Sequence, residues 1–232
     1  MKPDKLSDIT LISVDLFRTL IDVDRSLPQV WKIFLGECYT PELGEKYWDR
    51  ATEIVMGLLD EAALDDQHFR SAKIIYQETY SRLFKEIKLD FDPGQAAAAL
   101  IRGHQVNRLF TDAAPFLKKV GNKFPVILST DADIDMLTGI DRIYPFDHIF
   151  ISEELRTYKH NPRFFREVTA YYGLQPKNIL HIGDSYHDIV TPAKEGIVTC
   201  WLNRHERVWQ HATTPDFTVK SLMEILPLIV SD

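Results

Sequence analysis

The sequence predicts an α/β fold, a parallel sheet covered by helices, with a bundle of helices inserted after the first strand. Two features of the hydrophobic pattern support this prediction. Short apolar runs occur at residues 9–14 and then alternate with helical stretches after about residue 110, whereas residues 28–110 keep a helical period almost throughout. Short apolar strands separated by helices are typical of a parallel sheet that is buried on both faces.

Five short apolar runs are expected to form the sheet. They are residues 9–14, 125–129, 148–152, 178–183 and 197–202. The helix between the third and fourth runs has the clearest ends, because Asn161 is a typical N-cap, Pro162 suits the first helical position and Gly173 favours a stop. Residues 221–230 fit a last helix that Pro227 interrupts.

The inserted segment contains two long amphipathic series. Apolar residues recur every three or four positions from Trp48 to Ala62. They do so again from Phe69 to Ile87, so each series describes one apolar face of a helix. A further helix is expected to begin at Gln95. Three or four helices of this length form a bundle.

The pattern divides the chain into two domains. An α/β domain is expected from residues 1–21 and 106–232, and a helical domain from residues 22–105. The two connections between them, near residues 21–26 and 103–112, are the expected hinges. An insert of this kind is expected to close over the site, exclude water and select the substrate.

Composition excludes several classes of partner. The 232 residues are 45% hydrophobic and carry a net charge of −7, which disfavours a nucleic-acid or anionic-membrane surface. No apolar run approaches the ~20 residues of a membrane span. Cys38 and Cys200 have no metal-type spacing, so we expect two free thiols in a cytoplasmic protein. The sequence does not indicate an oligomeric state, and a monomer is compatible with it.

Three of the expected strands carry a polar residue at the carboxyl end. These residues are Asp15, Ser129 and Asp184. In open parallel sheets, ligands bind outside the carboxyl ends of the strands, near the point where the strand order reverses. The three side chains are therefore expected to lie around one site.

The nature of each residue suggests a role. Asp15 is a candidate nucleophile, because a carboxylate can attack phosphorus or carbon to form a covalent aspartyl intermediate that water then hydrolyses. Ser129 and the adjacent Thr130 are candidates for binding an anionic substrate, and the ammonium of Lys159 would neutralise clustered carboxylates and hold that anion. Taken alone, each residue has an ordinary explanation as a turn cap or a solvated surface group.

Asp184 and Asp188 form the strongest single signal. Gly183 allows a tight turn after the strand, and the two acids are expected on one side of a first helical turn. There they would also complement the helix dipole, which is the structural alternative. With Asp15 they would form an oxygen-only site, and Mg²⁺ prefers such ligands.

Together these motifs resemble those of the haloacid dehalogenase superfamily of hydrolases, over nearly the whole chain. The first superfamily motif, Asp-x-x-x-Thr, matches Asp15 and Thr19. The second matches Ser129, the third matches Lys159, and the last, Gly-Asp-x-x-x-Asp, matches residues 183–188. The resemblance implies a Rossmann-like core with a helical cap in the first insertion position.

The resemblance also implies a set of roles. Asp15 would be the nucleophile, with Thr19, Ser129 and Lys159 completing the catalytic group. Ser129, Thr130 and Lys159 would bind a small anionic substrate. The expected cofactor is Mg²⁺, held by Asp15, the backbone carbonyl of Phe17 and Asp184, with Asp188 as a ligand or close to one.

Phe17 departs from the phosphatase pattern, in which a second Asp at this position protonates the leaving alcohol and later activates water. Such acid–base catalysis contributes typically about 10²–10⁴-fold. We therefore expect a Mg²⁺-dependent phosphohydrolase whose substrate needs little protonation on departure, such as an acyl or aryl phosphate. Alternatively another residue supplies the proton, with His187 and Asp131 as candidates on position alone. Arg18 replaces the glycine usual in this turn.

Two other functions stay open. A 2-haloacid dehalogenase has an aromatic residue at this position and needs no acid, although those enzymes are metal-free and lack the Gly-Asp loop; Lys32 or Arg25 would then have to hold the substrate carboxylate. The second alternative is a catalytically weak binding or regulatory protein.

Four side chains of the insert are candidates to face the pocket, although a core or solvated position is the simpler account of each. They are Trp31, His68, Arg70 and Lys73.

Overall fold

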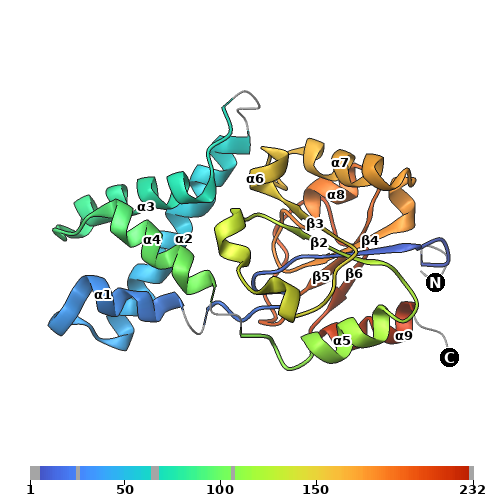
Figure 1. Ribbon diagram of the computed structural model, residues 1–232, viewed down its shortest axis with the longest axis horizontal. Helices are drawn as coiled ribbons and strands as arrows, with labels where there is room; N and C mark the ends of the chain where they lie inside the picture. The colour runs from blue at the N-terminus through green and yellow to red at the C-terminus, as the bar shows by residue number, and fades with distance from the viewer. Residues whose placement is uncertain (1–5, 25–26, 64–67, 106–107, 230–232) are drawn as a thin grey trace.

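The computed structural model describes residues 6–24, 27–63, 68–105 and 108–229. Its centre is a six-stranded sheet in the order β3-β2-β1-β4-β5-β6, in which every neighbouring pair is parallel (Figure 1). The strands are β1 Leu11–Val14, β2 Val126–Thr130, β3 His148–Ile151, β4 Ile179–Gly183, β5 Val198–Leu202 and β6 Phe217–Val219. From β1 the chain adds β2 and β3 on one side of the sheet and then β4, β5 and β6 on the other, as in doubly wound folds. The predicted α/β class is therefore confirmed.

Helices cover both faces of this sheet (Figure 1). One face carries α6 Ser152–Leu155, α7 Pro162–Tyr172 and α8 Val190–Lys194, and the other carries α5 Ala113–Val120 and α9 Leu226–Ile229. Because strand side chains alternate, Leu11 packs with Phe164 and Phe165 of α7, whereas Ile12 belongs to the larger cluster on the opposite face.

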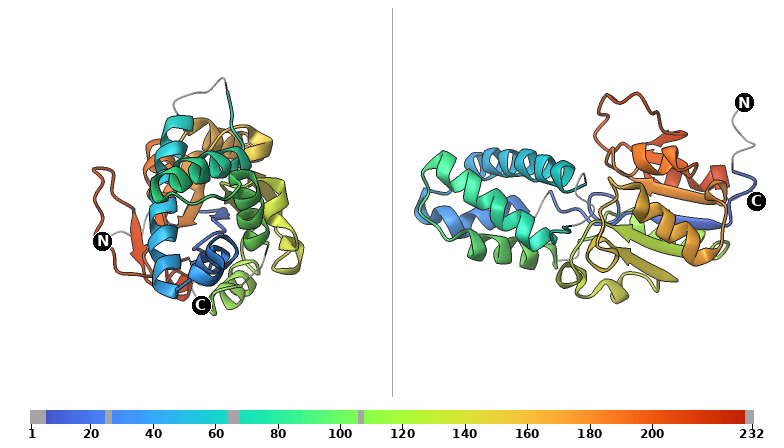
Figure 2. Two further views of the ribbon diagram at one scale, coloured as in Figure 1. Left: turned by 90° about the vertical axis from the view of Figure 1, so that its left-hand side faces the viewer. Right: turned by 90° about the horizontal axis from the view of Figure 1, so that it is seen from above.

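The inserted segment is helical, as predicted, and lies beyond one end of the sheet (Figure 2). Its helices are α1 Trp31–Leu35, α2 Pro41–Ala63, α3 Ala72–Ile87 and α4 Pro93–His104. An aromatic cluster fills its interior, in which Trp31 makes edge contacts with Phe34, Tyr80 and Phe84. Trp31 is fully buried, so its candidate role as a pocket residue gives way to a core position. The division into domains at residues 21 and 106 stays a prediction.

Short 3-10 helices join several elements. They are η1 Leu27–Val30, η2 Gly36–Cys38, η3 Ile134–Leu137, η4 Ile140–Arg142, η5 Pro176–Asn178 and η6 Leu222–Glu224. No helix in the described part of the chain combines the length and the apolar character that crossing a membrane requires.

The two connections between the sheet and the insert run side by side. Ile21 and Leu109 form an antiparallel bridge. The backbone N–H of Asp22 donates to the carbonyl of Arg108 at 2.8 Å, and that of Phe110 donates to the carbonyl of Leu20 at 2.9 Å. Residues 25–26 and 106–107 of the expected hinges lie outside the described residues. The hinge role itself stays a prediction.

Three elements differ from the sequence prediction. The helical series expected from Phe69 begins as α3 at Ala72. The last helix was expected to be interrupted at Pro227, but the break lies at Ile225 between η6 and α9, and Pro227 lies within α9. The strand β6 was not predicted, because only its last residue, Val219, is buried and its apolar signal is short. Each difference concerns a short or marginal segment whose state depends on its tertiary neighbours.

The start of α3 is set by a residue of the α/β part of the chain. The Asp133 carboxylate accepts from the backbone N–H groups of Ala72 at 2.7 Å and Lys73 at 2.9 Å. The adjacent Ser71 stands in the N-cap position, but its side chain makes no capping hydrogen bond. Asp133 thus caps a helix about 60 residues earlier in the chain and joins the insert to the α/β part.

Replacing Asp133 with alanine is expected to lower the free energy of unfolding by about 2 kcal/mol, because two N–H donors of α3 lose their acceptor. Urea denaturation followed by circular dichroism measures this change. Asp135→Ala is the matched control, because Asp135 is exposed on the same short helix. An equal effect of both substitutions would contradict the capping role.

Candidate active site

The three acids singled out in the sequence meet at the carboxyl end of the sheet. Asp15 follows β1, Asp184 follows β4, and Asp188 lies in the turn beyond. One carboxylate oxygen from each lies within 4.8 Å of the other two. All three residues are buried, with exposed fractions of 5% for Asp15, 8% for Asp184 and 1% for Asp188. Three acids are thus concentrated where solvent is largely excluded.

Lys159 brings one positive charge into this group. Its Nζ donates to Asp15 Oδ1 at 2.6 Å and to Asp188 Oδ1 at 2.5 Å, and the residue is 3% exposed. Lys159 lies just ahead of α7, and its backbone N–H donates to Asp131 Oδ1 at 2.9 Å. The loop that carries the lysine is therefore tied to the end of β2.

The two acids after β4 are positioned differently from the prediction. The helix begins only at Val190, so Asp184 and Asp188 lie on the turn before α8 and not within its first turn. Asp188 folds back, and its Oδ2 accepts from both the backbone N–H and the hydroxyl of Ser185 at 3.0 and 2.6 Å. A Cβ on Gly183 would overlap the Asp188 side chain, so this glycine provides space.

Burial and charge shift the pKa values of these groups in different directions. Burial raises the pKa of Asp15 to about 8, against the opposing charge of Lys159. Burial acts in the same direction on Asp188, but Lys159 and His181 overcome it and hold that pKa well below its usual range. Burial alone would lower the pKa of Lys159, yet Asp15 and Asp188 raise it above its ordinary value. One ammonium therefore cannot balance every acid.

A row of buried polar groups crosses the sheet beside the acids. Ser13 of β1 donates from its Oγ to Ser129 Oγ at 2.9 Å and lies 2.8 Å from Nδ1 of His181 on β4. The other ring nitrogen of His181 lies 3.2 Å from Asp188 Oδ1. Sequence reasoning missed Ser13 and His181, although a polar residue inside an otherwise apolar strand was a usable signal.

A cleft of about 660 Å³ opens over the acids. Six of the predicted site residues line it: Asp15, Phe17, Thr130, Lys159, Asp184 and Asp188. Asp131 and His187, which the sequence proposed as sources of the proton, line it as well. The site residues thus come from β1, β2, β4 and the loop before α7.

Two predicted residues do not reach the cleft. Ser129 is fully buried and contacts Ser13. Thr19 is fully buried too, and its hydroxyl has no hydrogen-bond partner among the described residues. The carbonyl of Thr19 accepts from Arg204 at 2.9 Å. Of the adjacent hydroxyl residues at the end of β2, Thr130 forms the wall of the cleft and Ser129 lies beneath it.

Arginines near the cleft were not predicted as site residues. Arg18 has a left-handed φ of 62°, in line with the glycine usual at this position, and its guanidinium pairs with Asp24 at 2.9 Å while lining the cleft. Arg207 donates to the backbone carbonyl of Asp184 at 2.8 Å and contacts Asp184 Oδ2 at 3.2 Å. Trp201 donates to the same carbonyl at 2.9 Å. These contacts fix Asp184.

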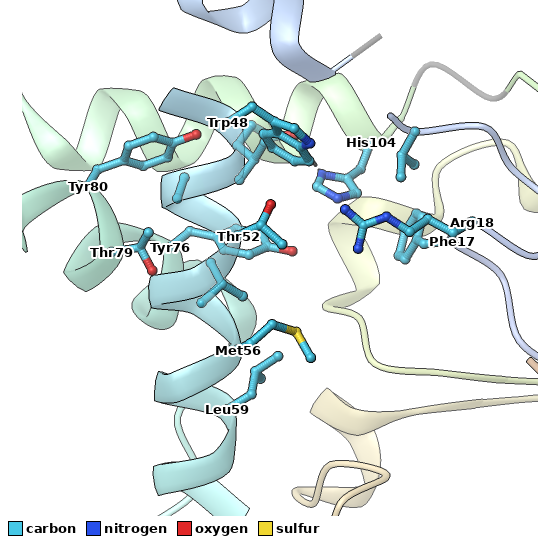
Figure 3. A pocket seen from close by; sticks show the side chains of 14 residues that line it. Phe17, Arg18, Trp48, Thr52, Met56, Leu59, Tyr76, Thr79, Tyr80 and His104 are labelled. Atoms are coloured by element: carbon cyan, nitrogen blue, oxygen red, sulfur yellow. Dashed lines mark hydrogen bonds between the residues drawn. The ribbon is translucent and has the colours of Figure 1, made fainter. Parts of the chain in front are cut away.

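A smaller apolar cavity of about 150 Å³ adjoins the cleft within the insert (Figure 3). Figure 3 shows Phe17 and Arg18 on one side and the α2 side chains Thr52 and Met56 opposite them. Phe17 packs edge-on against His104 with ring centroids 4.8 Å apart. The residues that line both the cavity and the cleft are Phe17, Arg18, Thr52, Met56 and Leu59. The two spaces therefore share a wall.

The remaining candidates of the insert lie away from the acids. Arg70 pairs with Glu78 at 2.8 Å, and the backbone of Lys73 contacts Asp133. Lys32 lies over the ring of Tyr39. Neither Arg70, Lys73 nor His68 is among the residues that line the cleft or the apolar cavity, and Arg25 lies outside the described residues.

The donor set at the acids fits a hard divalent cation. Asp15, Asp184 and Asp188 offer only carboxylate oxygens, and Mg²⁺ favours such ligands. The electrostatic balance agrees, because three buried acids face one buried ammonium, with Arg18 and Arg207 at the edge. A cation here would supply the charge that Lys159 alone does not.

The comparison with family models agrees with the motifs. A model described as haloacid dehalogenase-like hydrolase matches residues 9–196. Pyrimidine 5'-nucleotidase YjjG of Escherichia coli (strain K12) is 35% identical over 86 residues, which are 36% of this chain and 38% of that protein. Glyceraldehyde 3-phosphate phosphatase of Methanopyrus kandleri is 25% identical over 164 residues, 65% of this chain and 70% of that protein. The match to the nucleotidase thus spans little more than a third of that relative.

Solved structures resemble the chain along nearly its whole length. The L-2-haloacid dehalogenase from Xanthobacter autotrophicus, with chloropropionic acid covalently bound, superimposes with a TM-score of 0.81. The alignment covers 95% of this chain and 98% of that one at 16% identity. At this identity the similarity establishes the fold alone.

Lys159→Met is expected to destabilise the protein by roughly 3–5 kcal/mol, because it leaves buried carboxylates without their cation. Mg²⁺ should then raise the melting temperature of the variant more than that of the wild type. Thermal and urea unfolding with and without Mg²⁺ measure both effects. Lys177→Met is the control, because Lys177 forms an exposed pair with Asp8 and should change stability by less than ~1 kcal/mol. A Lys159 variant as stable as this control would contradict the charge balance.

Proposed function

The chain belongs to the haloacid dehalogenase-like hydrolase family, and we propose that it is a Mg²⁺-dependent phosphohydrolase that uses Asp15 as its nucleophile. One observation carries this proposal. Three buried carboxylates share a single buried ammonium at the carboxyl end of a parallel sheet. That arrangement suits a divalent cation together with a phosphoryl anion, and the family name on residues 9–196 is consistent with hydrolysis.

Each group has a proposed task. Asp15, Asp184 and Asp188, with the backbone carbonyl of Phe17, would hold Mg²⁺, which when bound neutralises charge on the phosphoryl oxygens. Lys159 would bind the same phosphoryl group, and its charge together with that of the bound cation would favour the ionised form of Asp15. Thr130, on the wall of the cleft, would donate a hydrogen bond to the substrate, and Ser129 would support it from below.

The proposed reaction has two steps. In the first, a carboxylate oxygen of Asp15 forms a bond to phosphorus while the bond from phosphorus to the leaving oxygen breaks, and the leaving group keeps the electron pair. In the second, water attacks the aspartyl phosphate, which releases inorganic phosphate and restores the Asp15 carboxylate. The proton of the attacking water passes to a base, for which Asp131 is the candidate because it lines the cleft and burial raises its pKa.

Phe17 points to the class of leaving group. Its side chain cannot protonate a departing alkoxide, which disfavours simple alkyl phosphates. The phenyl ring of Phe17 also lines the apolar cavity of about 150 Å³ beside the cleft. An apolar protein cavity of about that size binds benzene, so a single ring fits. We therefore favour an aryl phosphate, whose phenolate leaves without protonation. An acyl phosphate is the alternative substrate, because its carboxylate also leaves without protonation.

A 2-haloacid dehalogenase is the second candidate, and one observation favours it. Arg18, a fixed cation, stands beside Phe17 at the apolar cavity, where it could hold a substrate carboxylate while the cavity takes the alkyl group. Sequence reasoning considered Lys32 and Arg25 for this role and overlooked Arg18. The acidic cluster argues for the phosphohydrolase, because three buried carboxylates suit a divalent cation that would offset the charge of a phosphoryl group, whereas the metal-free dehalogenase reaction has no use for such a site.

The free thiols support a cytoplasmic location as part of the proposal. Cys200 is buried and Cys38 exposed, and neither forms a disulfide. A small-molecule anionic substrate is proposed as the partner.

A substrate panel with and without EDTA tests the function. The purified protein should release phosphate from p-nitrophenyl phosphate and acetyl phosphate faster than from glycerol phosphate, and EDTA should abolish all three activities. Asp15→Asn should abolish them as well, because the amide is not a nucleophile. Release of chloride from 2-chloropropionate that persists in EDTA would replace this proposal with the dehalogenase. Turnover of no compound would favour a binding protein.

Phe17→Asp is expected to raise kcat/KM for glycerol phosphate by at least ~10-fold, because it restores a group that can protonate the leaving oxygen. Phe17→Asn is the matched control, because asparagine has the size of aspartate but no acidic proton. Its kcat/KM for glycerol phosphate should not rise. Phosphate release measures both, and circular dichroism verifies folding. An equal gain in the two variants would attribute the effect to lost bulk and contradict the role assigned to Phe17.

A further inference from the structure

A second group of metal-ligating side chains lies at the junction between the insert and the α/β part. It consists of Asp60 near the end of α2, His160 next to Lys159, and His187 in the turn before α8. One ligand atom from each residue lies within 4.8 Å of the other two. These residues are separated by about 100 and 27 positions in sequence, so only the fold brings them together.

The two imidazoles lack ordinary hydrogen-bond partners. The side chains of His160 and His187 are each 5% exposed. Among the described residues, neither ring nitrogen of His160 nor Nε2 of His187 has a hydrogen-bond partner. Both Nε2 atoms instead converge on Asp60 Oδ1, at 3.2 Å from His160 and 3.6 Å from His187. Buried polar atoms of this kind ordinarily have a partner, and a metal ion would provide one.

We propose that Asp60, His160 and His187 form a binding site for a divalent transition metal, with Zn²⁺ as the best match. Two imidazoles and one carboxylate form a borderline donor set that Zn²⁺ accepts and Mg²⁺ does not favour. With three protein ligands, a water molecule completes a tetrahedral site. The carboxylate leaves the site one negative charge to offset the ion.

The surroundings support the site. The Tyr186 hydroxyl donates to Asp60 Oδ1 at 2.6 Å, so the carboxylate is held in place by a group that is not one of the three ligands. His211 stacks on the Tyr186 ring with centroids 4.7 Å apart, which fixes that ring in turn. Half of the Asp60 side chain remains exposed at 56%, so an ion has a path from solvent.

The site would join two parts of the chain that the acidic cluster does not join. Asp60 belongs to α2 of the insert, whereas His160 and His187 belong to loops at the carboxyl end of the sheet. Asp15, Asp184 and Asp188 all come from the α/β part. Bound Zn²⁺ would therefore hold the insert against the cleft without occupying the carboxylate site.

Titration with Co²⁺ tests the proposal without reference to turnover. The protein is stripped of metal with a chelator, dialysed and kept in excess Mg²⁺, which occupies the carboxylate site. Co²⁺ is then added while visible absorption is followed, and Zn²⁺ is used to displace it. One equivalent of Co²⁺ with the bands of a four-coordinate site is expected, and Asp60→Asn and His160→Gln should each weaken binding by at least ~10-fold.

Two controls separate this site from others. His148→Gln should bind Co²⁺ like the wild type, because His148 begins β3 at the amino end of the sheet and stacks on Tyr171, away from the proposed site at the carboxyl end. Asp184→Asn should also bind normally, because it alters only the carboxylate site, so a failure of the proposed hydrolase activity leaves this result unaffected. Absence of Co²⁺ binding, binding abolished by Asp184→Asn, or binding unchanged in Asp60→Asn and His160→Gln would each overturn the proposal.

Discussion

The structure depends on the burial of several acids around one lysine. Moving a carboxylate out of water costs several kcal/mol, so such a cluster persists only where geometry supplies counter-charge and hydrogen bonds. Lys159 supplies the charge to Asp15 and Asp188, while Ser185 and His181 supply hydrogen bonds to Asp188. The balance is incomplete, as the raised pKa of Asp15 indicates. A site that lacks positive charge in this way attracts cations. The surrounding fold keeps the acids and the lysine in place.

Much of this site could be predicted from the sequence, because its residues follow strands. An apolar run that ends at a carboxylate marks Asp15 and Asp184, and the parallel order of the sheet then brings them to one edge. The spacing of Asp184 and Asp188 also identified the pair, although their helical placement was wrong. The helix starts later because the Asp188 side chain folds back onto Ser185, a local hydrogen bond that competes with helix formation.

Other features depend on contacts between segments far apart in the chain. The start of α3 is set by Asp133, and Arg207 reaches Asp184 from a loop with no regular structure. The hydrophobic periodicity of a sequence does not indicate contacts between segments that lie far apart in the chain. Arg18 is a different case, because the sequence marks its position in the turn but does not indicate where its side chain lies. The residue was treated as a substitute for glycine, whereas its guanidinium lines both the cleft and the apolar cavity.

The paired connections at Leu20–Asp22 and Arg108–Phe110 carry a consequence for how this chain can vary. Their backbones are hydrogen-bonded to each other across an antiparallel bridge, so they form one short ribbon and not two independent tethers. Adding or removing a single residue in one of them would shift its register and turn its side chains to the opposite side. Changes in the length of the two connections are therefore coupled. An insertion or deletion in one connection is tolerated only with a compensating change in the other.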